Sequence, residues 1–258
     1  MTTFPSQPFA PAALITGGAR RIGRHITMAL ARAGYGVVVQ VHHSRPAAED
    51  LLGDIAGTGV RMAVVEADLA DHDSVASLVP AASAAIGPLT LLVNNAAEFE
   101  PDEIGHLDRD RFDRHFAVNL RAPVFLAEAF AEQAPTGRDA SIVNLLDQRI
   151  YRPTPRFLSY GLTKSALHAA TVTLAQALAP RIRVNGVAPG PTLPSSRQDA
   201  ASFARQTRSV PLGHGPAPEE IAAAVVYLAS APSVTGVTIA VDGGQHLAWR
   251  TVAAEVSE

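Results

Sequence analysis

The sequence has no cysteine and, among its 21 basic residues, only one lysine. Without cysteine neither a disulfide framework nor a thiolate metal site can form, and we expect an intracellular, cytoplasmic protein. The formal net charge of −3 provides no basic surface of the kind that nucleic acid or an anionic membrane attracts. No stretch approaches the roughly 18 apolar residues of a membrane helix, and we expect residues 1–10 to form a loose arm because they lack the pattern of a signal peptide. A small molecule is therefore the expected partner.

The composition indicates one large core. Hydrophobic residues make up 47% of the 258 positions and charged residues 17%, and no break in composition separates a second domain, so we expect a single domain over residues 1–258. Short apolar runs alternate with alanine-rich segments of helical period. The predicted strands are 12–16, 36–41, 60–67, 89–95, 140–146, 182–188 and 236–241, and the predicted helices are 21–34, 71–86, 109–133, 156–178 and two that begin near 46 and 218. This alternation predicts an α/β fold, a doubly wound parallel sheet of Rossmann type with about seven strands and helices on both faces.

Ligands of such a sheet bind beyond the carboxyl ends of its strands, so the turns that follow the strands are the places to look for chemistry. In the first turn Gly17, Gly18 and Gly23 let the backbone approach a pyrophosphate, whose charge the next helix N-terminus favours; a tight turn without a ligand is the alternative. Arg21 stands where a further glycine is expected. Arginine lacks a glycine's backbone freedom, but its guanidinium can reach a phosphate or a carbonyl-bearing ring; a solvated surface arginine is the alternative.

The second turn lacks the acidic residue that usually holds the adenosine ribose of NAD. It offers His42, His43, Ser44 and Arg45 instead, donors that suit the 2′-phosphate of NADPH, although an ordinary polar turn has a similar composition. No histidine or carboxylate lies at ligand spacing from the two histidines, so we expect no metal site.

Two further strand ends carry polar groups. Asp68 follows the third strand, where it would accept the adenine amino group or cap the next helix. Asn94 and Asn95 end the fourth strand, and the small Ala96 and Ala97 leave room for a flat cofactor; an asparagine pair in a turn is the alternative.

Tyr160 and Lys164 are four residues apart and share one face of a predicted helix. We expect the ammonium to lower the pKa of the phenol from its usual value of about 10, which makes Tyr160 a proton donor near neutral pH. Lys164 is the only lysine in a sequence that otherwise uses arginine for positive charge, which argues against an accidental surface pair. Asp147 emerges at the end of the strand that precedes this helix.

The sequence resembles the short-chain dehydrogenase/reductase family between about Pro11 and Gly244. The resemblance rests on six segments in the family's order, TGGARRIG, NNAA, VNLRAP, YGLTK, VNGVAPGP and VDGG. It implies an NAD(P)-dependent oxidoreductase in which Tyr160 is the catalytic acid, Lys164 binds the nicotinamide ribose and tunes that tyrosine, and Asn119 supports a proton-relay water.

The same resemblance implies a homotetramer that pairs helices 109–133 and 156–178, and a substrate lid over about 190–210. The residues that it places at the cofactor are Gly17, Arg20, Arg21, Ile22, His42, His43, Ser44, Arg45, Asp68, Leu69, Asn95, Ala96, Ala97, Lys164, Pro189, Gly190 and Thr192.

Two departures from the common pattern resemble the pteridine reductase branch. Most members have a serine thirteen residues before the tyrosine, but this chain has Asp147, whose charge would repel an oxyanion forming on a ketone and suits a substrate that presents N–H groups or takes a proton on nitrogen. The branch has an aspartate there, and its glycine turn reads T-G-x-x-x-R-x-G, as TGGARRIG does. Phe99 corresponds to an aromatic residue that stacks on the pterin ring, although burial in the core is the alternative.

This branch resemblance implies an NADPH-dependent reductase of a dihydropterin-type ring. Asp147 and Tyr160 would deliver the proton to a ring nitrogen, and Arg21 and Phe99 would complete the substrate contacts. Tyr151 and Phe203 are further candidates for the pocket wall. A carbonyl or 3-oxoacyl reductase remains an alternative, and so does a non-catalytic NADPH-binding sensor, although the catalytic tyrosine and lysine are both present.

Overall fold

The computed structural model describes residues 10–248. Its sheet has seven parallel strands in the order β3-β2-β1-β4-β5-β6-β7, which confirms the predicted fold class. The strands are β1 (Ala12–Thr16), β2 (Gly36–Val41), β3 (Met62–Glu66), β4 (Leu91–Asn94), β5 (Ala140–Leu145), β6 (Ile182–Pro189) and β7 (Thr238–Val241).

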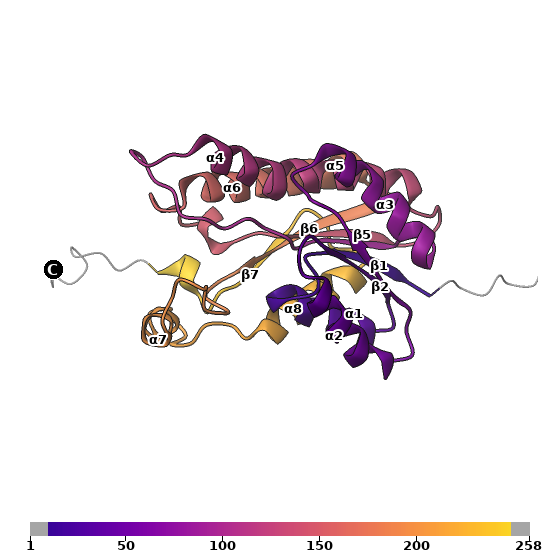
Figure 1. The fold of residues 1–258 in the computed structure, drawn as a ribbon, viewed down its shortest axis with the longest axis horizontal. Helices are drawn as coiled ribbons and strands as arrows, with labels where there is room; N and C mark the ends of the chain where they lie inside the picture. Colours follow the sequence, from indigo (N-terminus) through magenta and orange to yellow (C-terminus); the bar gives the residue numbers. More distant parts are fainter. Residues whose placement is uncertain (1–9, 249–258) are drawn as a thin grey trace, which may run out of the picture.

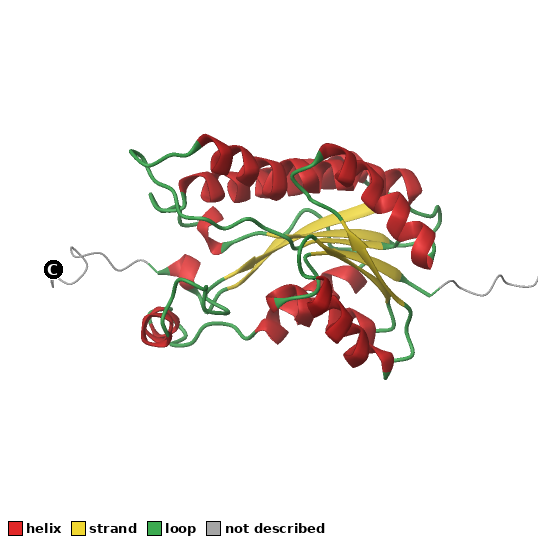
Figure 2. Cartoon of the chain, viewed as in Figure 1, coloured by secondary structure: helices red, strands yellow, loops and turns green. Residues whose placement is uncertain are grey.

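Helices cover both faces of the sheet (Figures 1 and 2). One face carries α3 (His72–Ile86), α4 (Arg109–Phe116), α5 (Ala122–Gln133) and α6 (Leu158–Leu178). The opposite face carries α1 (Arg21–Arg32), α2 (Arg45–Ala56) and α8 (Pro218–Ser230). Among the described helices, none is both long enough and apolar enough to span a bilayer.

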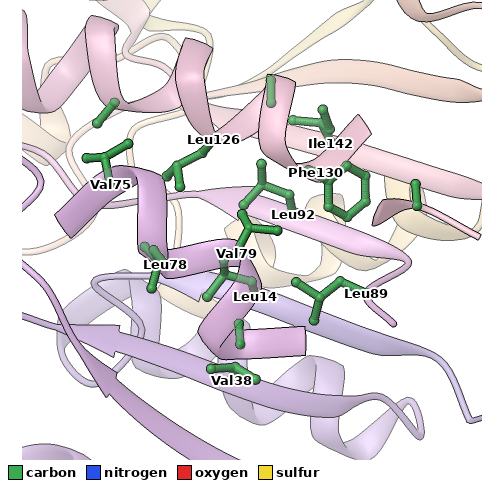
Figure 3. Packing of buried hydrophobic residues seen from close by; sticks show 14 of the residues in the cluster. Leu14, Val38, Val75, Leu78, Val79, Leu89, Leu92, Leu126, Phe130 and Ile142 are labelled. Atoms are coloured by element: carbon green, nitrogen blue, oxygen red, sulfur yellow. The ribbon is translucent and has the colours of Figure 1, made fainter. Parts of the chain in front are cut away.

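Every residue of β1, β2, β4 and β5 is buried, because helices pack on both faces of these strands. Alternate residues of each strand contribute to two separate apolar clusters. On the α3 side, Leu14, Leu92 and Ile142 pack against α3 and α5, with Phe130 fully buried among them (Figure 3). Removal of this much apolar surface from water is the main source of stability for the sheet, at about 1.5–3 kcal/mol per large side chain.

The structure differs from the predicted elements in two places. The single helix predicted over 109–133 is α4 and α5 joined by a five-residue π-helical turn, Ala117–Arg121, which contains Asn119. The expected lid over 190–210 contains a helix, α7 (Ala200–Arg208), whose N-cap Asp199 accepts from the backbone N–H of Ser202 at 2.7 Å.

The strand order reverses between β1 and β4, which lie side by side although two strands separate them in the chain. Residues that follow neighbouring strands therefore meet at one edge of the sheet, and the reversal opens a crevice there. Two short 3₁₀ turns lie on the same side, Gln148–Ile150 after β5 and Gln245–Leu247 after β7.

Candidate active site

Two clefts meet at the carboxyl edge of the sheet. The Tyr160 cleft, of about 470 Å³, is lined by Tyr160, Asp147 and residues of the lid. The glycine-turn cleft, of about 630 Å³, lies along the turn after β1 and the end of β2. Arg21, Ile22, Asn95 and Ala97 line both clefts, so the two form one continuous groove.

The glycine turn is built for close packing. Gly17 has a φ of +59°, at which a side chain is strained, and a Cβ on Gly23 would lie 2.2 Å from the carbonyl oxygen of Gly17, so a side chain at Gly23 would clash with the turn. The side-chain amide of Asn95 donates to the carbonyls of Thr16 and Gly17 at 2.8 and 3.1 Å and fixes the turn from the neighbouring strand. The amide of Asn95 is thus occupied in shaping the site.

The N-terminus of α1 opens on this cleft. Its N-cap, Arg20, makes no side-chain capping bond, and the first turn of the helix has no acidic residue. The free N–H groups and the positive end of the helix dipole therefore favour an anion such as a pyrophosphate.

Arg21 adopts the left-handed backbone conformation, with a φ of +51°. Arginine lacks a glycine's freedom to adopt this conformation, so the surrounding turn imposes it at a cost of about 1–2 kcal/mol. Its guanidinium donates to the carbonyls of Leu193 and Pro194 at 3.3 and 2.9 Å. Arg21 therefore connects the glycine turn to the lid.

The far end of the glycine-turn cleft is lined by Arg20, His42, His43 and Ser44. The two imidazole rings lie 3.5 Å apart between centroids. Arg45 is not among the lining residues, and its guanidinium lies 3.5 Å from Glu49 and 3.9 Å from Glu66. The donors present at this end are thus Arg20, Ser44 and the two histidines.

The adjacent wall contains Asp68, Leu69 and Ala96. Asp68 accepts from the backbone N–H of Ala70 at 2.9 Å and lies 3.7 Å from His42, whereas Asp71 is the residue that caps α3. Burial alone would raise the pKa of Asp68, but the Ala70 N–H and the nearby positive charges lower it overall. Asp68 is therefore not the helix cap, and its carboxylate lies at the cleft between His42 and Arg114.

In the Tyr160 cleft, the phenol of Tyr160 donates to Oδ2 of Asp147 at 3.0 Å. Asp147 follows β5 in extended conformation, and its Oδ1 accepts from the backbone N–H of Arg149 at 2.8 Å. The ammonium of Lys164 donates to the carbonyl of Leu145 at 2.6 Å and lies 5.7 Å from the centre of the Tyr160 ring. The structure thus brings the predicted acid, base and ammonium together.

The expected effect of Lys164 on Tyr160 is not observed. Burial, and then the negative charge of Asp147, raise the pKa of Tyr160 well above its usual value, and the charge that opposes this shift is Arg149. Burial lowers the pKa of Lys164 to about 8, with Asp147 opposing the shift. Lys164 forms its hydrogen bond with the backbone rather than with the phenol, so it does not make Tyr160 more acidic in this arrangement.

An aromatic wall forms one side of the Tyr160 cleft. The rings of Phe99 and Phe157 are stacked with centroids 4.4 Å apart, and Phe99 meets Tyr160 edge to face at 4.7 Å. Phe99 is partly exposed to the cleft, so it is not a core residue. Phe157, the N-cap of α6, has a φ of +58°, a strained conformation for a bulky residue and one that persists only where surrounding contacts impose it.

Buried polar residues hold the loop that carries Phe99. Asn119 accepts from the N–H of Glu98 at 2.8 Å and donates to its carbonyl at 3.0 Å and to Thr163 at 3.2 Å. The two amide hydrogens of Asn119 are thereby used. Its contacts position the loop, and the proton-relay role remains a prediction.

The lid covers the Tyr160 cleft. Pro189, Gly190 and Thr192 line it, and so does Phe203 from α7, whereas Tyr151 is not among the lining residues. Arg197 crosses from the lid to the Phe99 loop, where it pairs with Glu100 at 2.9 Å and donates to the carbonyl of Phe99 at 2.7 Å. Residues 190–210, the expected lid, are thus fixed to the rest of the site from two sides, by Arg21 and by Arg197.

Several lining residues were not found from the sequence. Arg149, two residues after Asp147, had a usable signal in its charge and spacing. Gln40 accepts from the N–H of Gly17 at 2.9 Å and donates to the carbonyl of Ala67 at 2.7 Å, but a lone glutamine in an apolar strand gave no indication of ligand chemistry. Phe157 had none either, because its position depends on an unusual backbone conformation. Within residues 10–248 there is no group of three or more metal-binding side chains.

Comparison with known proteins places the chain in a family. The family model described as enoyl-(acyl carrier protein) reductase matches residues 17–246. A 3-oxoacyl-[acyl-carrier-protein] reductase of Staphylococcus aureus is 32% identical over 91% of this chain and 98% of its own. A short-chain type dehydrogenase/reductase of Picea abies is 31% identical over 90% of this chain and 91% of its own.

Among solved structures, FolM alternative dihydrofolate reductase 1 from Brucella suis, in complex with NADP, is 48% identical. It superposes with a TM-score of 0.91 over 94% of this chain and 98% of that one. The Brucella canis protein of the same name, also with NADP, is 46% identical with a TM-score of 0.90 over 95% and 98% of the two chains. With this agreement in sequence and fold, the chain belongs to the short-chain dehydrogenase/reductase family of NAD(P)-dependent oxidoreductases.

Proposed function

We propose that this protein is an NADPH-dependent reductase of a flat nitrogen heterocycle of the pterin type, such as a dihydropteridine or dihydrofolate. The observation that carries the proposal is the hydrogen bond between Tyr160 and Asp147 beside Phe99. A carboxylate at this position suits a substrate with N–H groups, and an aromatic ring beside it suits a flat heterocycle. The names of the two Brucella proteins, which are 48% and 46% identical to this chain, support the same substrate class.

The groove fits a dinucleotide. The uncapped N-terminus of α1 would hold the pyrophosphate, and Asp68 and Leu69 would bound the adenine. Arg20, His42, His43 and Ser44 would hold the 2′-phosphate, because they line the far end of the cleft and Arg45 is engaged elsewhere. At the other end Lys164, Pro189, Gly190 and Thr192 would surround the nicotinamide and its ribose. The NADP in both Brucella structures supports this choice of cofactor.

In the proposed reaction a C=N bond of the heterocycle loses its π bond as a C–H and an N–H bond form. Bound NADPH supplies the hydride for the carbon. Tyr160 would supply the proton for the nitrogen. Asp147 would accept a hydrogen bond from a substrate N–H group and, through its hydrogen bond from the Tyr160 hydroxyl, hold the phenol in place. Lys164 would help to return a proton to Tyr160, since its pKa near 8 allows proton exchange close to neutral pH.

We further propose a homotetramer in which α4, α5 and α6 pair between subunits. Phe125, Leu162 and Val172 lie on α5 and α6 and are 42%, 47% and 39% exposed. Apolar side chains of this size gathered on one layer favour contact with another subunit.

The direct test follows NADPH consumption with dihydrobiopterin, dihydrofolate and a 3-oxoacyl thioester in parallel, for the wild type, Asp147→Ser and Tyr160→Phe. We expect turnover of a pterin, a loss of at least about 100-fold in both variants, and NADPH binding within about twofold of the wild type. Turnover of the thioester alone would refute the pterin assignment and favour the activity named for the Staphylococcus aureus relative. An unchanged rate in Tyr160→Phe would exclude Tyr160 as the catalytic acid. No turnover of any of the three substrates by the wild type, with NADPH binding retained, would leave the NADPH-binding sensor.

A further inference from the structure

Asp147 forms an ion pair with a residue of its own turn. Nη1 of Arg149 lies 3.0 Å from Oδ2 of Asp147, the oxygen that also accepts from Tyr160. The backbone N–H of Arg149 donates to the other carboxylate oxygen at 2.8 Å. The exposed fractions of the Arg149 and Asp147 side chains are 19% and 16%. The pair is thus largely removed from solvent.

The 3₁₀ turn Gln148–Ile150 explains this contact. Asp147 is the N-cap of the turn, and its carboxylate accepts from the backbone N–H of Arg149. This bond keeps Arg149 next to the carboxylate. The guanidinium carbon of Arg149 also lies 5.9 Å from the Tyr160 ring centre and 5.5 Å from that of Phe99. Arg149 therefore contacts the acid, the phenol and the aromatic wall.

Arg149 lies where it would balance the negative charge that arises when Tyr160 loses its proton. In the resting site, Asp147 faces Arg149 and the buried Lys164. When Tyr160 gives its proton to the substrate, its O–H bond breaks, an N–H bond forms, and a phenolate remains next to the carboxylate. Two negative charges then lie side by side in a buried site, opposed by the positive charges of Arg149 and Lys164. Without Arg149 the site would carry a net negative charge that burial penalises strongly.

We propose that Arg149 is a positioning and charge-balancing residue of the reaction, and that it makes an aspartate usable at this position by offsetting the negative charge of Asp147 beside the Tyr160 phenol. Arg149 acts through Asp147 and not as a proton donor. The inference rests on the proposed reductase activity but not on the identity of the substrate. It also receives support from the pKa of Tyr160, which Arg149 lowers against the opposing effects of burial and Asp147.

A double-mutant cycle tests this role on whichever substrate the wild type reduces. Arg149→Gln is measured in the wild-type background and in the Asp147→Asn background, with Arg149→Lys as the conservative variant. Arg152→Gln is the matched control, because Arg152 is exposed three residues further on and its backbone N–H donates to the carbonyl of Gln148 at 3.3 Å. NADPH binding and the melting temperature report whether each variant is folded.

We expect Arg149→Gln to lower kcat about 100-fold while the Kd for NADPH stays within about twofold, and Arg149→Lys to recover about tenfold of the loss. In the Asp147→Asn background the same substitution should cost less than about threefold, because no carboxylate charge is left to offset. An equal loss in both backgrounds would overturn the proposal, and so would a loss no larger than that of Arg152→Gln. If pterins are not reduced but a carbonyl substrate is, the proposed substrate fails while the cycle still tests Arg149.

Discussion

Replacement of Asp102 by alanine should separate the N-terminus of α6 from the loop that carries Phe99. The Asp102 carboxylate, 5% exposed, accepts from the Ser159 backbone N–H at 3.1 and 3.2 Å and from the Ser159 hydroxyl. Its own carbonyl accepts from the N–H of Leu158 at 3.2 Å. Asp102 therefore caps the first turn of α6 from 57 residues away in the chain. The residue that it holds, Ser159, directly precedes Tyr160.

The cost follows from the donors that remain. Asp102→Ala leaves the N–H and the hydroxyl of Ser159 buried without their acceptor, and each unsatisfied donor costs about 1–3 kcal/mol. His115 does not replace the carboxylate, because its Nε2 accepts from the N–H of Glu100 at 3.1 Å and its Nδ1 must then donate to Ser159. We expect the free energy of unfolding to fall by about 2–5 kcal/mol, which is a large fraction of the 5–15 kcal/mol typical of a folded domain.

Urea unfolding, read by far-UV circular dichroism at one protein concentration, measures this change. Asp108→Ala is the matched control, because Asp108 is an exposed N-cap whose carboxylate accepts from the N–H of Arg111 at 2.8 Å, and its loss should cost about 1 kcal/mol. The variant Asp102→Ala should also lower kcat without weakening NADPH binding, since the phenol and Phe99 lose their fixed separation. A cost no larger than that of Asp108→Ala would refute the reasoning that this contact is a buried cap.

Three further outcomes are expected. Arg20→Gln should weaken NADPH binding about 10–100-fold and leave NADH binding within about twofold, as measured by nucleotide fluorescence. Arg45→Gln should change the binding of neither nucleotide by more than about threefold. Equal effects of the two substitutions on NADPH binding would place the 2′-phosphate elsewhere. The pH profile of kcat/KM should fall above about pH 8, where Lys164 loses its proton, and a profile that stays flat to pH 9.5 would contradict the pKa of about 8. Arg21→Gly should relieve about 1 kcal/mol of left-handed strain and remove two exposed hydrogen bonds to the lid. The free energy of unfolding should therefore change by less than about 1 kcal/mol, while the substrate KM rises several-fold. An unchanged KM would show that these bonds do not hold the lid.

The fold was predictable because its signals are local and repeat along the chain. The alternation of β-branched runs with alanine-rich helical periods gives both the strands and the parallel connection between them. The helix in the lid was missed because α7 is nine residues long and has no buried residue, so its sequence lacks the repeated large apolar residues that mark a helix packed on a core.

The site was predictable where a residue type alone carries chemistry. Tyr160, Lys164 and Asp147 were found in this way, and the structure places them in one cleft. Their electrostatics were not predictable, because the sequence gives neither burial nor the direction of a side chain. The pKa of Tyr160 depends on burial and on Asp147 more than on Lys164, and Lys164 forms its hydrogen bond with a backbone carbonyl.

The two residues that depart from the common family pattern both have a compensation in the structure. The left-handed strain at Arg21 accompanies two hydrogen bonds that hold the lid, which a glycine at that position could not make. The negative charge of Asp147 is paired with Arg149 in the same turn. A serine at this position carries no charge and would not need this arginine. A substitution that brings only Asp147 into a serine-containing relative should therefore inactivate it, because the carboxylate would oppose the phenolate without a balancing charge. The same substitution together with an arginine two residues later should retain more activity, and equal inactivity of the single and double variants would show that the compensation lies elsewhere in the site.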